Sequence, residues 1–205
     1  MQLLGGFLSP YVRRTAVSLN LTGVAYESVK VPVWDDPDAV KKHNPLVRIP
    51  TLVLDDGDVL VESYAILDAL DEMAGDKRLV PASGAERRKV MKTTAVGAGT
   101  IDKTIWAVYE LRFHDKEHVS RSWVDHNEAQ ALGGFGWLNE QAAAAGDGWL
   151  CGANITQADV TAAVAYSFAN KVRPKMDLAA KFPALAAHNA RCEALDAFKN
   201  AALPS

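Results

Sequence analysis

The chain is poor in cysteine and has no long apolar run. Both absences limit the kinds of protein that it can be. Only two cysteines, Cys151 and Cys192, occur among 205 residues, so neither a disulfide framework nor a cysteine-based zinc site is predicted. No run of about 18 apolar residues is present, and the first residues lack a basic leader and an apolar signal core. We therefore expect a cytoplasmic protein that does not bind membranes.

An excess of basic charge is also missing. The 22 Lys and Arg and the 25 Asp and Glu residues give a formal net charge of -3, which does not favour nucleic acid or an anionic membrane as a partner. Hydrophobic residues make up 49% and charged residues 23% of the chain, as in ordinary globular proteins. The length suits one large domain or two small ones.

The sequence pattern changes near residue 78. Before it, β-like and helical runs alternate as a βαβ unit followed by a ββα unit, in which the turn Asp55–Asp58 joins two strands of a hairpin. After it, alanine-rich helical stretches continue to Ala202. We predict an α/β domain over residues 1–77, a linker over residues 78–86 and an all-helical domain over residues 87–205.

Local signals mark three special positions in the first domain. Ser9-Pro10 predicts a helix start, because serine is a favoured N-cap and proline a favoured first helical residue. Ser63 opens a second helix, where it is expected to cap the helix end and to be able to bind an anion there. Pro50 cannot donate to a β ladder, so we expect it at the first residue or edge of a strand over residues 51–54. X-Pro bonds are cis in only about 5% of cases, which favours trans at Pro50 when it is taken alone.

Taken in order, these features resemble the glutathione transferases. The βαβ pattern followed by Asn44-Pro45, Ile49-Pro50, a hairpin and Glu62-Ser63 is similar to the thioredoxin-like N-terminal domain of that family. The helical second half is similar to its C-terminal domain in length and order. The resemblance implies a mixed four-stranded sheet in the βαβ-ββα domain, an all-α C-terminal domain, a cis bond before Pro50, glutathione as co-substrate and a homodimer.

The resemblance also gives roles to single residues. Ile49 would pair its main chain with glutathione beside the cis Pro50, and Arg48 lies where several classes carry a basic residue near the glycyl end. Glu62 and Ser63 match the pair that holds the γ-glutamyl group. These residue types suit the ligand, because glutathione presents one ammonium and two carboxylates.

Ser9 is the residue that the resemblance places at the glutathione sulfur. Serine-dependent classes of the tau, theta and zeta type carry a serine at this strand-to-helix turn, and in the tau class it begins a Ser-Pro-Phe motif. Here Tyr11 stands in place of that phenylalanine, as a second candidate donor or part of the substrate pocket. A cysteine at position 9 could form a mixed disulfide with glutathione and a serine cannot, so conjugation is favoured over reduction.

The pocket for a small hydrophobic electrophile is expected on the helical domain. Asp102, Trp106, Tyr109 and Phe113 share one helical face. Such a stripe usually belongs to a core, but in the family this helix borders the cleft, so the resemblance makes Trp106 and Tyr109 candidates for the pocket. Trp34, in the loop before the second helix, has a weaker claim.

A short motif suggests a metal site. HDKEH, residues 114–118, matches the H-x-x-E-H pattern of a zinc peptidase family, with His114 and His118 one helical turn apart. The charged flanks Lys116 and Arg121 indicate a solvated face, so no metal is predicted.

A second motif is interpreted as structural. In ITQADV, residues 155–160, Thr156 can cap a helix while Asp159 returns the bond, which forms a capping box. The same box is a hallmark of the transferase C-terminal domain, where it acts in folding. It supports the resemblance independently of the N-terminal motifs.

Three functions remain open. The first is a glutathione transferase, and the second is a glutathione-dependent isomerase or disulfide reductase that uses the same thiolate with another acceptor pocket. Ligand selectivity and disulfide turnover would separate these two. The third is a non-enzymatic interaction module, which has no need of Ser9, Ile49-Pro50 and Glu62-Ser63 together.

Overall fold

The chain folds into two compact units in a computed structural model that describes residues 1–31, 33–34 and 36–204. The first unit comprises Met1–Leu79 together with Ala194–Ser205, and the second comprises Val80–Glu193. Residues 87–205 are predicted as one helical domain, whereas in the structure the segment that begins at Ala194 belongs to the first unit.

A mixed four-stranded sheet forms the centre of the first unit. Its strands are β1 (Gln2–Leu4), β2 (Glu27–Val29), β3 (Thr51–Val53) and β4 (Val59–Val61), in the order β2-β1-β3-β4. Strand β1 is parallel to β2 and antiparallel to β3, and β3 is antiparallel to β4. The predicted βαβ-ββα arrangement is therefore confirmed.

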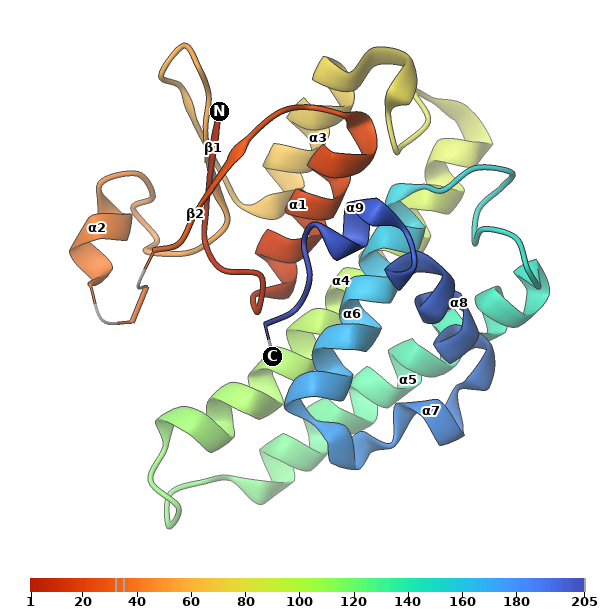
Figure 1. Ribbon diagram of the computed structural model, residues 1–205. Helices are drawn as coiled ribbons and strands as arrows, with labels where there is room; N and C mark the ends of the chain where they lie inside the picture. Colours follow the sequence, from red (N-terminus) through yellow and green to blue (C-terminus); the bar gives the residue numbers. More distant parts are fainter. Residues whose placement is uncertain (32, 35, 205) are drawn as a thin grey trace. The chain divides into compact units, whose positions relative to one another are not determined.

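Helices α1 (Pro10–Thr22) and α3 (Ser63–Ala74) lie side by side on one side of this sheet, and α2 (Pro37–Lys41) lies on the other (Figure 1). A short 3₁₀ turn, η1 (Gly75–Lys77), follows α3. Val12 and Leu19 of α1 and Ile66 of α3 are buried together with Leu3 and Leu52 of the sheet. Burial of these side chains supplies most of the driving force that holds helices and sheet together.

The C-terminal segment of the chain packs against α1. Helix α9 (Asp196–Lys199) buries Phe198. The Nε of Arg13 donates a 2.8 Å hydrogen bond to the carbonyl of Ala201, and the Nδ2 of Asn20 donates a 2.8 Å bond to the carbonyl of Ala197. Two polar side chains of α1 are thus held by main-chain atoms that come from the end of the sequence.

The second unit is all-helical, as predicted. Its elements are α4 (Gly84–Phe113), α5 (Arg121–Ala145), α6 (Gln157–Val172), η2 (Pro174–Met176), α7 (Leu178–Lys181) and α8 (Pro183–Glu193). Helix α4 packs along α5 and α6, and α8 packs on α5 and α6 (Figure 1). Gly134 permits the close approach of α5 to α4, because a Cβ added there would lie 2.0 Å from the Oγ1 of Thr100.

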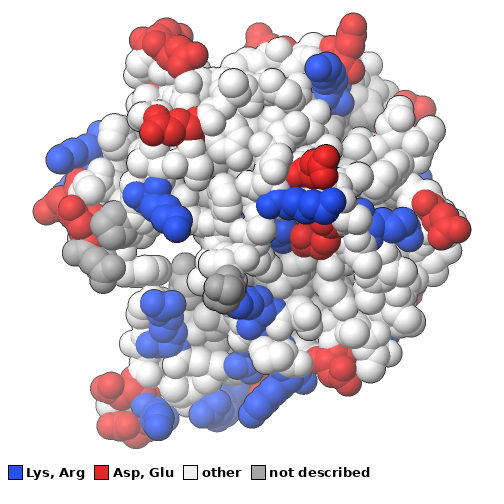
Figure 2. Space-filling model, in the orientation of Figure 1, with Lys and Arg blue, Asp and Glu red and all other residues white. Residues whose placement is uncertain are grey.

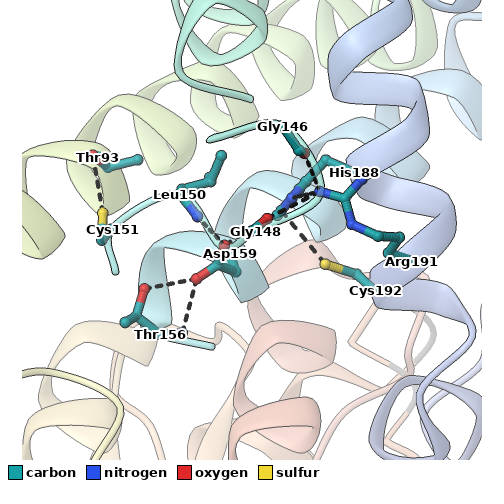
Figure 3. Close-up of polar contacts among 10 residues, drawn as sticks. All are labelled: Thr93, Gly146, Gly148, Leu150, Cys151, Thr156, Asp159, His188, Arg191 and Cys192. Carbon is teal, nitrogen blue, oxygen red and sulfur yellow. Dashed lines mark hydrogen bonds and ion pairs between the residues drawn. The ribbon is translucent and has the colours of Figure 1, made fainter. Parts of the chain in front are cut away.

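The predicted capping box is present at the start of α6. The buried carboxylate of Asp159 accepts hydrogen bonds of 2.8 Å from both the N–H and the hydroxyl of Thr156. Its other oxygen accepts a 2.8 Å bond from the N–H of Leu150 (Figure 3). Asp159 therefore joins the preceding loop to the helix start, which agrees with its predicted structural role.

His188 on α8 extends this polar cluster. Its Nε2 lies 3.5 Å from Asp159 Oδ1 and 3.5 Å from Cys192 Sγ, and its Nδ1 lies 3.4 Å from Arg191 Nη2 (Figure 3). Because arginine only donates, Nδ1 accepts and the neutral ring carries its proton on Nε2, toward Asp159. Burial lowers the pKa of His188; Asp159 opposes this effect and Arg191 adds to it. Burial also raises the pKa of the Cys192 thiol, which keeps it protonated.

Charged side chains of both signs occur on the face of the protein that Figure 2 shows. Lysines and arginines lie among aspartates and glutamates over much of the face that Figure 2 shows, in keeping with the net charge of -3. Within the part of the chain that the structure describes, no helix is long and apolar enough to span a lipid bilayer.

Candidate functional site

Ser9 lies at the turn between β1 and α1. It is the N-cap of α1, as predicted, and its Oγ accepts a 3.4 Å hydrogen bond from the N–H of Val12. A serine hydroxyl that accepts in this way still has its own proton to donate. Ser9 and Tyr11 are both half-buried, so the turn can present a hydroxyl to a ligand.

The loop before β3 contains a cis peptide bond between Ile49 and Pro50, as the resemblance implies. The buried Asn44 organises this loop, because its Nδ2 donates to the carbonyl of Arg48 at 2.9 Å and its Oδ1 accepts from the N–H of Leu46 at 2.9 Å. Strand β3 is internal in the sheet. Pro50 is accommodated because it precedes the first paired residue of that strand, Thr51.

This loop lies against the turn that carries Ser9. Gly5 directly follows β1 and has a φ of +132°, and a Cβ at this position would lie 2.5 Å from Val12 Cγ2 and 3.1 Å from the Cβ of Ile49. Only glycine fits such a backbone conformation and such a close approach. The serine turn and the cis-proline loop are therefore neighbours within the first unit.

The start of α3 differs from the prediction in one respect. Glu62, with φ 63° and ψ 131°, is the N-cap, and Ser63 is the first helical residue instead of the cap. The reason is the left-handed φ of Glu62, which turns the chain so that its own carbonyl accepts the first helical bond, from Ile66 N–H at 3.1 Å. The N–H groups of the first turn have no partner within the helix and suit an anion.

Arg14 was not predicted as a site residue. Its side chain is 0% exposed, and its Nε donates a 3.1 Å hydrogen bond to the Oγ of Ser63, which is 2% exposed. Its guanidinium carbon lies 4.5 Å from the centre of the Tyr64 ring. An arginine in a helix usually faces solvent, so sequence reasoning missed it. The signal available was weak: Arg14 is close in the sequence to the apolar residues Val12, Ala16 and Val17.

The two predicted charged ligands of glutathione contact each other. Arg48 Nη1 lies 3.5 Å from Glu62 Oε1, and the two side chains are 54% and 38% exposed. A surface pair of this kind is worth at most about 1 kcal/mol. Both groups can therefore exchange this contact for a ligand that carries an ammonium and carboxylates at little cost.

The aromatic stripe on α4 is not part of the helical core. Trp106 is 53% exposed and Tyr109 is 38% exposed, whereas Ile101 and Ala107 on the same helix are buried. The ring of Tyr109 meets that of Phe113 edge to face, with centroids 5.3 Å apart. The usual interpretation of such a stripe as core is thus wrong here, and its role in a substrate pocket stays a prediction.

The HDKEH motif lies in a loop. Helix α4 ends at Phe113 and α5 begins at Arg121, so the prediction that His114 and His118 lie one helical turn apart is wrong. The chain turns instead, with the N–H of His118 donating to the carbonyl of Asp115 at 2.8 Å. Ligand atoms of Asp115, Glu117 and His118 lie within 4.8 Å of one another, but all three residues are exposed. Exposed side chains of this kind do not make a dry metal site.

A hollow of about 580 Å³ lies at the other end of β1 from Ser9. Its lining includes Met1, Tyr26, Glu27 and Asp55 but none of the predicted site residues. Ser9 and the cis-proline loop lie at the opposite end of the strand. We therefore do not assign the hollow to the predicted glutathione site.

Both halves of the chain match known family models. Residues 8–73 match the glutathione S-transferase N-terminal domain, and residues 121–191 match the glutathione S-transferase C-terminal domain. Maleylacetoacetate isomerase of Rhizobium meliloti (strain 1021) is 30% identical over 196 residues, which cover 92% of this chain and 89% of that protein. The chain belongs to the glutathione S-transferase family.

Other relatives within this glutathione S-transferase family match part or all of the chain. The uncharacterized GST-like protein YibF of Escherichia coli (strain K12) is 27% identical over 110 residues, and this match spans only about half of either protein, 54%. The crystal structure of a glutathione S-transferase from Methylobacterium radiotolerans in complex with glutathione sulfonate is 27% identical, with a TM-score of 0.89, and the match covers 100% of this chain and 96% of that chain.

Proposed function

We propose that the protein is a glutathione transferase that stabilises the glutathione thiolate for attack on a small hydrophobic electrophile. The observation that carries this proposal is the grouping of three anchors in the first unit. Ser9 at the start of α1 and the cis-proline loop at Ile49 are neighbours. The start of α3 adds Glu62 and Ser63, and Glu62 is joined to that loop through Arg48.

One serine hydroxyl can supply most of the free energy that is needed to lower the thiol pKa of glutathione. Lowering the thiol pKa of glutathione from about 8.5 to about 6.5 requires roughly 2.7 kcal/mol. A hydrogen bond to a charged group contributes about 1.5–3 kcal/mol, and the positive end of α1, where Ser9 lies, adds to it. No covalent role of Ser9 is needed.

The remaining anchors fit the rest of the ligand. We assign the backbone of Ile49, beside Pro50, to pairing with the cysteinyl main chain, Arg48 to the glycyl carboxylate, and Glu62 and Ser63 to the γ-glutamyl ammonium and carboxylate. Tyr11, Trp106 and Tyr109 are assigned to the electrophile pocket. Of these, Trp106 and Tyr109 are exposed aromatics on one helix, which suits a hydrophobic substrate.

The test is the ultraviolet absorbance of the glutathione thiolate, titrated over pH with wild-type protein and with Ser9→Ala. We expect a thiolate below pH 7 in the wild type and its loss in the variant. Ser120→Ala is the matched control, because Ser120 also caps a helix through its hydroxyl, accepting from Trp123 N–H. If glutathione does not bind, or binds without ionising, the proposal is wrong.

A glutathione-dependent isomerase is the second candidate. Its support is the likeness to maleylacetoacetate isomerase along 92% of the chain. Both reactions need the glutathione thiolate that Ser9 is proposed to stabilise, so the two are separated by the acceptor. Conversion of a maleyl compound from cis to trans without net consumption of glutathione favours the isomerase. A disulfide reductase has less support, because both cysteines of the chain, Cys151 and Cys192, lie in the second unit.

We also propose a cytoplasmic homodimer. Both cysteines are unpaired thiols in the structure, as in a reducing compartment. Tyr64 and Met73 on α3 are exposed apolar side chains, which suit a two-fold interface. Sedimentation equilibrium and cell fractionation test these two points, and a monomeric mass would contradict the first.

A further inference from the structure

Arg14 is buried directly behind the start of α3. Its side chain is 0% exposed, and it reaches from the second turn of α1 to the first residue of α3. The contact is a 3.1 Å hydrogen bond from Nε to Ser63 Oγ. Tyr64 covers the guanidinium at 4.5 Å, which restricts its movement. A charged group is buried in this way only where its hydrogen bonds compensate the loss of water.

The direction of this hydrogen bond determines what Ser63 can do. A guanidinium has donors and no acceptor, whereas a hydroxyl has one donor and two acceptor positions. The bond from Arg14 Nε therefore occupies an acceptor position of Ser63. The hydroxyl proton of Ser63 is left to donate to a different group.

The surroundings of Ser63 favour an anion as that group. The N–H groups of the first turn of α3 and the positive end of this helix of 12 residues lie at the same place. A carboxylate there accepts from the hydroxyl and from the backbone at once. A hydroxyl free to rotate would share its time between donating and accepting. Because Arg14 occupies one of its two acceptor positions, the hydroxyl proton of Ser63 points away from the guanidinium, and donation to the ligand is favoured.

We propose that Arg14 is a positioning residue that fixes Ser63 as a hydrogen-bond donor to the α-carboxylate of the γ-glutamyl end of glutathione. This inference rests on the proposed function and names a residue that the sequence analysis did not place in the site. Arg14 acts through Ser63, so its effect depends on the carboxylate of the ligand.

Calorimetric titration with two ligands tests the inference. One is glutathione, and the other is the tripeptide analogue γ-aminobutyryl-cysteinyl-glycine, which lacks only the α-carboxylate. Wild-type protein should prefer glutathione by about tenfold to a hundredfold, the range of a hydrogen bond to a charged group. Arg14→Lys, Ser63→Ala and the double variant should each lose the part of this preference that the Ser63 hydroxyl supplies, whereas the part from the backbone N–H groups of α3 remains. The double variant should lose no more than Ser63→Ala alone.

Arg13→Lys is the matched control. Arg13 is the preceding residue on α1 and is also buried, but its Nε donates to the carbonyl of Ala201. It should keep the preference for glutathione even if its thermal stability falls. Arg14→Met replaces Arg14→Lys if the latter does not fold, because methionine is unbranched and neutral and carries no N–H donor.

The outcomes separate the inference from the proposed function. If wild-type protein binds neither ligand, the proposed function is wrong and the inference falls with it. If the wild type binds both ligands equally, or if the Arg14 variants keep the wild-type preference, the inference is wrong while glutathione binding stands. Equal weakening of both ligands by the Arg14 variants would show a structural role only and would also overturn it.

Discussion

At the scale of single residues, two neighbouring arginines serve different parts of the first unit. Arg13 bonds the carbonyl of Ala201, and Arg14 bonds the hydroxyl of Ser63. Successive helical residues point about 100° apart, so one helix can support two different neighbours with adjacent side chains. Both guanidinium groups are buried. Each hydrogen bond therefore helps to offset the cost of removing a charge from water.

His188 should make the second unit sensitive to acid. Its pKa is lowered by burial, whereas in the unfolded chain a histidine has a pKa near 6.5. Between these two values the unfolded state binds more protons, so stability falls as the pH decreases below about 6.5. We expect the free energy of unfolding to be smaller at pH 5.5 than at pH 7.5 because of this group.

The measurement is urea unfolding of wild type and His188→Asn across that pH range. The variant is less stable at pH 7.5 but should show the smaller decrease on acidification, because asparagine does not titrate. His118→Asn, at an exposed position, should follow the wild type. Parallel curves for wild type and His188→Asn would contradict the prediction.

At the scale of elements, the contact between α4 and α5 depends on one of two adjacent glycines. A Cβ at Gly134 would lie 2.0 Å from Thr100 Oγ1 and 3.2 Å from Thr100 Cβ, whereas a Cβ at Gly133 meets nothing within 4 Å. Thr100 cannot easily turn away, because its hydroxyl donates to the carbonyl of Val96 at 2.8 Å.

Alanine should therefore have opposite effects at these two positions. Gly134→Ala is expected to destabilise the protein by about 1–3 kcal/mol through overpacking. Gly133→Ala is expected to stabilise it by up to about 1 kcal/mol, because alanine favours a helix interior over glycine. Urea unfolding of the two variants checks this, and a shift of the same sign in both would show that the helix contact does not decide the outcome.

Several helix starts and turns that are marked by short sequence motifs were predicted correctly. Ser9 caps α1, the Asp-Gly turn joins β3 to β4, and Asp159 closes the box at α6. Contacts between residues far apart in the sequence were not predicted. Nothing near Asp159 points to His188, and nothing near Arg14 points to Ser63, because each pair meets only when two helices pack. The boundary of α4 before His114 was missed for a related reason, since a short motif was interpreted with an assumed helical period.

At the scale of the whole molecule, the last residues should stabilise the first unit and not the second. They supply the carbonyls of Ala197 and Ala201 and the buried ring of Phe198 to α1. Deleting residues 194–205 removes these contacts, of which burial of the phenylalanine alone is worth about 1.5–3 kcal/mol. We expect faster amide hydrogen exchange in α1 and unchanged exchange in α4, α5 and α6.

Hydrogen exchange followed by mass spectrometry makes this comparison. A chain that ends at Ala202 keeps the three contacts and is the control. Equal loss of protection in both units, or no loss in α1, would contradict the prediction.

The return of the chain to α1 also sets an order of events during protein synthesis. Ribosomes deliver the N-terminal strands and helices first, and domains generally fold as they emerge. Arg13 and Asn20 in α1 nevertheless take their partners from residues 197 and 201, which are translated only after every helix of the second unit. A nascent chain can form the sheet early, but the helix that begins at Ser9 gains its full support only when translation is nearly finished.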